Sequence, residues 1–179
     1  MLTLSDLLKV VVAGVILTSP AAAEQVVVRH TEYSNDKITD GGHVVACVVT
    51  LAVVASPDPR ILNFQFLQFN GRAGWKITGG VMNWKDQSAV AKRVADGNFS
   101  ASAFLYKNAF QKDLTPEGQL VGVLTRDDLY HSFSQAFFRR PYSVSVRWEN
   151  AADETDYYIE ESPPLPVVRN FRDCVSTLH

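Results

Sequence analysis

The chain has 179 residues, of which 46% are hydrophobic and 20% are charged, with 10 Gly and 8 Pro. These proportions are typical of one folded globular domain and exclude a disordered or collagen-like chain. Seventeen Lys and Arg residues against nineteen Asp and Glu residues give a formal charge of −2. Proteins that bind the phosphate backbone of a nucleic acid usually carry a basic excess or a basic stripe, and this sequence has neither. We therefore expect no nucleic-acid partner.

Residues 1–23 have the three parts of a secretory signal peptide. Lys9 precedes an apolar run over residues 10–17, and three alanines follow at residues 21–23. Small side chains of this kind are typical of a signal-peptidase cleavage site. The apolar run is much shorter than the roughly 20 residues that a membrane-spanning helix needs. We expect cleavage after residue 23, which leaves a single β-rich domain over residues 24–179, in the periplasm or secreted, with no transmembrane segment.

The two cysteines, Cys47 and Cys174, both lie in the expected mature chain. In a cytosolic protein they would be read as two buried thiols. An oxidising compartment favours their pairing instead. No C-x-x-C motif is present, so nothing points to thiol chemistry. The sequence predicts a structural disulfide between Cys47 and Cys174, which would join an early strand to the last element of the chain.

Strand signals dominate the first half of the mature chain. The long apolar run over residues 44–54 is rich in β-branched side chains, which favour strands over helices. Asn70-Gly71 is a strong hairpin-turn signal. Apolar and polar residues alternate from residue 61 and slip by one position after Phe66, which predicts a β-bulge at residues 66–67. The expected strands are residues 24–29, 44–54, 61–69 and 75–77.

The second half combines strands with two helices. Residues 87–94 fit either a short helix or a strand, and Asp96-Gly97-Asn98 resembles the tip of a hairpin. Residues 125–128 resemble a capping box ahead of a helix over residues 129–137. A second amphipathic helix is expected over residues 167–178. The further expected strands are residues 99–106, 120–124, 142–148 and 157–159.

These elements predict a mainly β fold of the α+β class. We expect a single antiparallel sheet or a β-sandwich, with one internal helix and a C-terminal helix docked on it. The sequence shows no internal repeat and no linker that would divide it into two domains.

The search for catalytic and metal-binding motifs is negative. The chain contains no G-x-S-x-G motif, and its glycine pairs do not form a phosphate-binding loop. Zinc needs three or four converging ligands, but the histidines are scattered. The acidic stretch over residues 149–161 lacks the residue order of a calcium-binding loop. We expect no catalytic residue, no metal and no cofactor. The four histidines are His30, His43, His131 and His179.

Four aromatic residues are candidates for a surface binding patch. Trp75 and Trp84 flank a glycine-rich loop. Tyr157 and Tyr158 are adjacent, so in a strand their side chains must point to opposite faces. Packing in the core is the interpretation that the sequence favours. Where they are exposed, they would form a surface that binds a protein, a glycan or a lipid.

The sequence thus favours a non-enzymatic binding, accessory or inhibitor protein of the bacterial envelope, whose partner is an unknown protein or envelope component. One alternative is a hydrolase of envelope polymers whose site forms only on folding, from carboxylates or from His43 and His131. Another alternative is a carrier that holds a small apolar ligand inside the β-structure.

Overall fold

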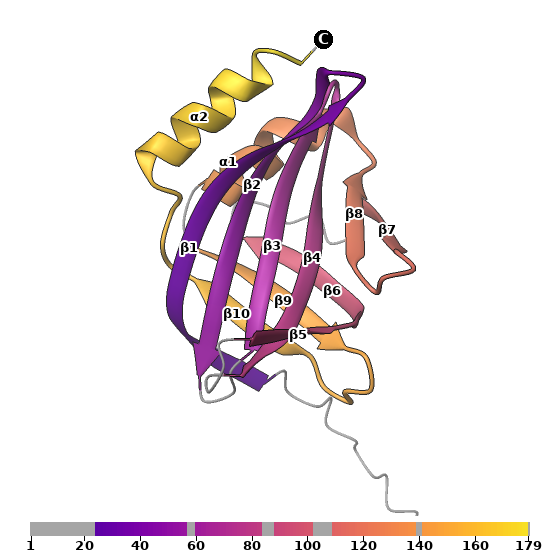
Figure 1. Cartoon of the computed structure of the whole chain (residues 1–179), viewed down its shortest axis with the longest axis vertical. Helices are drawn as coiled ribbons and strands as arrows, with labels where there is room; N and C mark the ends of the chain where they lie inside the picture. The colour runs from indigo at the N-terminus through magenta and orange to yellow at the C-terminus, as the bar shows by residue number, and fades with distance from the viewer. Residues whose placement is uncertain (1–23, 57–59, 84–87, 102–108, 139–140, 179) are drawn as a thin grey trace, which may run out of the picture.

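Over the residues that it describes, the computed structural model of the protein is mainly β, with two α-helices (Figure 1). It describes residues 24–56, 60–83, 88–101, 109–138 and 141–178. The expected signal peptide lies outside these residues. No helix in the described part of the chain is long and apolar enough to cross a membrane.

Seven strands form one antiparallel sheet. Its order is β1-β2-β3-β4-β8-β7, and β5 pairs with β4 beyond the segment that pairs with β8. The strands are β1 (Glu24–Asp40), β2 (His43–Ser56), β3 (Arg60–Phe69), β4 (Arg72–Asn83), β5 (Ser88–Lys92), β7 (Phe110–Leu114) and β8 (Leu120–Leu124).

The other three strands form a smaller sheet in the order β6-β9-β10. They are β6 (Val94–Ala101), β9 (Tyr142–Trp148) and β10 (Thr155–Ile159). Figure 1 shows them crossing behind the lower part of β1–β4. The two sheets are joined because the first residues of β1 pair in parallel with β10, whereas the rest of β1 pairs with β2. The predicted mainly β fold with two helices is confirmed.

The core lies between the large sheet and the elements that cover it. Phe64 and Phe66 on β3 are fully buried. Phe64 contacts Phe99 of the small sheet, with ring centroids 5.5 Å apart. Phe66 contacts Phe137 of α1 (Tyr130–Phe138) at 5.0 Å and Phe171 of α2 (Leu165–Val175) at 5.5 Å. The small sheet and both helices therefore cover the same face of the large sheet.

Two local predictions in the strands are wrong. The register of β3 runs through Phe66 and Leu67 without a shift, so no bulge lies there. The alternation slips because Leu67 is 7% exposed on the opposite face, beside its partner Val48. Gly97 does not form a hairpin tip either, because it lies inside β6 and pairs with Val146. The strand alternative for residues 87–94 is correct in part, with β5 ending at Lys92.

The predicted capping box before the internal helix is also absent. The helix begins with a 3-10 turn at Asp127–Leu129, whose N-cap residue, Arg126, makes no capping bond through its side chain. The hydroxyl of Thr125 instead donates a hydrogen bond to the carbonyl of Ala109, at 3.0 Å. Thr125 thus ties the start of the helix to the residue before β7, which is a long-range contact that the local sequence does not reveal.

Candidate functional site

The disulfide joins the large sheet to the C-terminal helix. Cys47 on β2 is bonded to Cys174 on α2, with Cα atoms 5.9 Å apart, which confirms the predicted pair. Cys47 is fully buried. Close to the bond, Phe171 packs against Phe66 and against Phe138, the latter with ring centroids 5.4 Å apart. One covalent bond and one aromatic anchor therefore hold α2 on the sheet.

A groove opens beside this disulfide. It encloses about 290 Å³ and is lined by His43, Val44, Val45, Asn70, Thr177 and Leu178. One wall is the beginning of β2 and the other is the chain just after α2. The disulfide links the two walls, because Cys47 lies two residues after Val45 and Cys174 lies three residues before Thr177. Val45 is 38% exposed, which is high for a large apolar side chain. We call this site the hairpin groove.

A second hollow lies on the β4–β8–β7 side of the large sheet. It encloses about 350 Å³ and is lined by Arg72, Gln111, Val123, Leu124, Thr125 and Asp127. Its charged groups are one guanidinium and one carboxylate, both exposed. This composition suits a polar ligand or solvent, whereas glycoside hydrolysis requires a pair of carboxyl groups.

The four predicted patch residues do not form one surface. Trp75 is 1% exposed and Tyr157 is 0% exposed, so both belong to the core. Tyr158 is 39% exposed, because neighbouring strand residues point to opposite faces. Trp84 lies outside the described residues. Of the three that can be placed, only Tyr158 is available to a partner.

Three of the four histidines can be placed. His30, His43 and His131 are exposed, and His179 lies outside the described residues. Only His43 lines one of the two hollows described above. Among the residues that the structure describes, no group of three or more His, Cys, Asp or Glu side chains could hold a metal ion.

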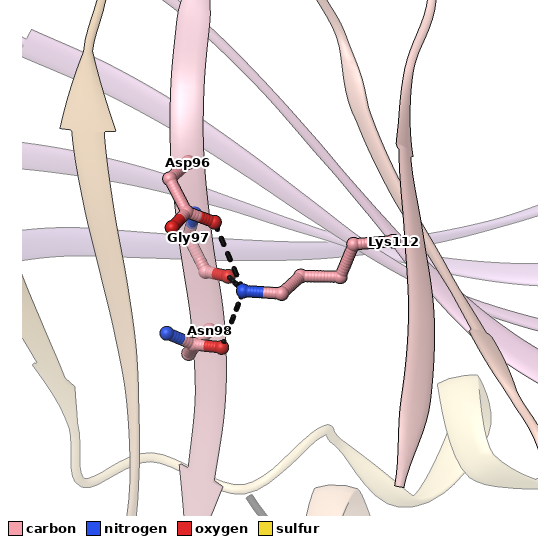
Figure 2. Close-up of polar contacts among 4 residues, drawn as sticks. All are labelled: Asp96, Gly97, Asn98 and Lys112. Carbon is pink, nitrogen blue, oxygen red and sulfur yellow. Dashed lines mark hydrogen bonds and ion pairs between the residues drawn. The ribbon is translucent and has the colours of Figure 1, made fainter. Parts of the chain in front are cut away.

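A polar cluster that the sequence did not indicate lies between β6 and β7 (Figure 2). Lys112 on β7 extends across to β6 and donates three hydrogen bonds. The acceptors are Asp96 Oδ1 at 2.9 Å, the carbonyl of Gly97 at 3.1 Å and Asn98 Oδ1 at 2.9 Å. All three hydrogens of the ammonium group are thereby used. No local signal could have found this cluster, since it depends on how the two sheets are placed.

The charges of this cluster depend on one another. Partial burial by itself would raise the pKa of Asp96. Hydrogen bonds from Lys112 and from the N–H of Gly97, together with the charges of Lys112 and Arg147, outweigh burial and lower the pKa below its ordinary value. Asp96 is therefore a carboxylate at neutral pH, and Arg147 is a second cation near it, in addition to Lys112.

A second polar cluster fixes the connection between β10 and α2. The Tyr33 hydroxyl on β1 donates to the carbonyl of Glu161 at 2.6 Å, and the Tyr142 hydroxyl lies 3.3 Å from that of Tyr33. Because Tyr33 uses its only hydrogen on Glu161, Tyr142 is the donor of this pair. Thr31 donates to the carboxylate of Glu161. Burial raises the pKa of Tyr142 well above its ordinary value, and the neighbouring Tyr33 adds to this effect.

Comparison with known proteins leaves the chain without a recognised relative. No protein-family model, no curated protein and no solved structure matches it.

Proposed function

We propose that this chain is an exported, non-enzymatic binding domain, an accessory or inhibitor protein of the bacterial envelope. Export is supported by the signal-peptide pattern of residues 1–23 and by the Cys47–Cys174 disulfide, since such bonds persist in oxidising compartments. The same two features support periplasmic or secreted localisation.

The observation that carries the binding role is the hairpin groove. Its lining includes the apolar residues Val44, Val45 and Leu178, and His43, Asn70 and Thr177 add hydrogen-bonding groups. Apolar surface with a few polar groups around it is the usual composition of a binding site. Because the disulfide links the two walls, the groove is held in shape before a partner arrives, which lowers the entropy lost on binding.

The two alternative functions have less support. The second hollow offers one carboxylate, Asp127, where an envelope-polymer hydrolase of the glycosidase type needs two. A carrier of apolar ligands needs space inside the fold, whereas the interior around Phe66 is occupied by four further aromatic rings. These rings belong to Phe133, Phe137, Phe138 and Phe171.

Capture from an envelope extract tests the proposal. The oxidised protein should retain a specific partner, and Val45→Asp should abolish that retention by placing a charge in the apolar groove. Val90→Asp is the matched control, because Val90 is a valine that is 66% exposed on β5, away from the groove. Retention of the same partner by Val45→Asp, or no partner for the wild type, would contradict a binding role for the groove.

A further inference from the structure

The strands β6 and β7 stand at the two ends of the strand order. β6 pairs with β9, and β7 pairs with β8. The edge of β6 away from β9 and the edge of β7 away from β8 face each other in Figure 2, with the Lys112 side chain between them. We call this space the β6–β7 seam, bounded by Asp96–Asn98 on β6 and by Lys112 on β7. An edge strand carries backbone donors and acceptors that are able to pair with another chain.

The backbone of Gly97 faces the seam. Opposed residues of an antiparallel pair either exchange two hydrogen bonds or turn their N–H and C=O groups away from each other. Gly97 is of the second kind, because its N–H donates to Asp96 Oδ1 at 2.8 Å and its carbonyl accepts from Lys112. Two charged side chains therefore cap this one backbone position.

The backbone of Lys112 faces the seam from the other side. On β7, the bonds Thr125 N to Ala109 O and Thr115 N to Gln119 O mark the odd-numbered positions as those that bond towards β8. By the same alternation, the N–H and C=O of Lys112 point away from β8. Gly97 and Lys112 thus present complementary backbone groups to the same space.

The reach of the Lys112 side chain sets the width of the seam, because its ammonium group bonds to three acceptors on β6. An extended lysine side chain with its hydrogen bond spans about 10 Å, roughly two of the spacings that separate neighbouring strands in a sheet. The seam is closed at the beginning of β6. There the Val94 N–H donates to the carbonyl of Gly118 at 2.9 Å, and Arg93 donates to the carbonyl of Pro116 at 2.9 Å. A strand between β6 and β7 would continue the ladder from these bonds towards the end of β6.

The charges indicate what such a strand must carry. Insertion would displace the Lys112 ammonium from its three acceptors. Asp96 would keep Arg147 as a nearby cation, whereas Lys112 would lose its carboxylate. An acidic side chain on the incoming segment would replace Asp96 as the partner of the Lys112 ammonium, which is 32% exposed, and would form a charge-assisted hydrogen bond with it.

We propose that the β6–β7 seam accepts an extended segment of a partner polypeptide, which pairs with Gly97 and with the backbone of Lys112 and offers an acidic side chain to the Lys112 ammonium. The Lys112 side chain covers the seam until that segment arrives. This surface is separate from the hairpin groove, so failure of the function proposed above would not affect this proposal.

The test uses the purified, disulfide-bonded protein and a displayed library of random ten-residue peptides. Enriched peptides should contain Asp or Glu, and methylation of alternate backbone nitrogens in a synthetic copy should abolish binding. Replacing the acidic residue by its amide should weaken binding about tenfold, as expected for loss of a charge-assisted hydrogen bond. In Lys112→Met the acid and amide peptides should bind equally, whereas Lys112→Arg and the exposed control Lys37→Met should keep the preference.

Hydrogen exchange gives the location, because binding should slow exchange of the Gly97 amide. Absence of enriched peptides, binding that tolerates backbone methylation, or an acid preference that survives Lys112→Met would each overturn the proposal. Self-association of the wild-type chain with protection of Gly97 would assign the seam to a second copy and would also overturn it. Circular dichroism and the melting temperature of each variant show that it is folded before its binding is compared.

Discussion

The indole ring of Trp75 on β4 lies directly against Gly122 on the neighbouring strand β8. A Cβ atom added to Gly122 would approach the Cε2, Cζ2 and Nε1 atoms of the indole more closely than real Cβ atoms approach their neighbours. Trp75 and Gly122 are also direct partners in the β4–β8 ladder. The absence of a side chain at Gly122 therefore makes room for one of the largest side chains of the core.

We expect Gly122→Ala to lower the free energy of unfolding by about 1–3 kcal/mol, the usual cost of overpacking a core. Chemical denaturation of the oxidised protein measures this loss. In a Trp75→Phe background the penalty should shrink, because phenylalanine lacks the indole atoms that meet the added methyl group. An equal penalty in both backgrounds would show that the tryptophan is not the cause.

The anchoring of α2 by Phe171 gives a second prediction. Phe171 is 4% exposed and packs on Phe66 and Phe138. Phe171→Ala should lower the free energy of unfolding by about 3 kcal/mol, the lower end of the range for a buried phenylalanine. Leu165→Ala is the control on the same helix, since Leu165 is 81% exposed. The idea of an aromatic anchor fails if the two substitutions have similar effects on urea unfolding.

The lowered pKa of Asp96 predicts an acid-dependent loss of stability. A group whose pKa is lower in the folded state stabilises the fold above its ordinary pKa of 3.8, and this contribution disappears as the pH falls through the folded value. The melting temperature of the wild type should therefore fall more steeply below about pH 4 than that of Asp96→Asn. Parallel curves for the two proteins would argue against the bonds from Lys112 and Gly97 as a source of stability.

Tyr142 predicts the opposite behaviour at alkaline pH. Its pKa is raised in the folded state, so its contribution is complete below the ordinary value of 10.0 and is lost as the pH rises above it. Between pH 9.5 and 11, stability of the wild type should decline faster than that of Tyr142→Phe. Tyr158→Phe, on the exposed side of β10, serves as control and should follow the wild type. An identical decline in Tyr142→Phe would contradict this role for burial.

The burial of Trp75 is predictable from the sequence. Asn70-Gly71 correctly marks a two-residue hairpin, in which Phe69 pairs with Arg72. The same register pairs Trp75 with Phe66, so both side chains lie on the same face of the sheet. Phe66 is one of the apolar residues that alternate with polar ones in this strand, so the turn alone places Trp75 on the same apolar face. The disulfide was predictable for another reason, since compartment and cysteine number leave one possible pair.

The contacts at the β6–β7 seam could not be predicted in this way. Asp96 and Gly97 have the composition of a turn, and they form a strand because they pair with Arg147 and Val146 of β9 and because Gly97 packs close to Ile77, 20 residues away in the sequence. An added Cβ at Gly97 would lie 3.0 Å from Ile77 Cδ1. Lys112 and Asp96 meet because two edge strands from different sheets face each other. Local sequence patterns carry no information on that arrangement.

Intact mass of the native protein from an envelope extract, alkylated with and without prior reduction, tests the central claim most directly. We predict a chain that begins at Glu24, takes up no alkylating reagent before reduction and takes up two equivalents afterwards, at Cys47 and Cys174. A chain that still begins at Met1, or two thiols that react without reduction, would contradict an exported domain whose C-terminal helix is bonded to its sheet.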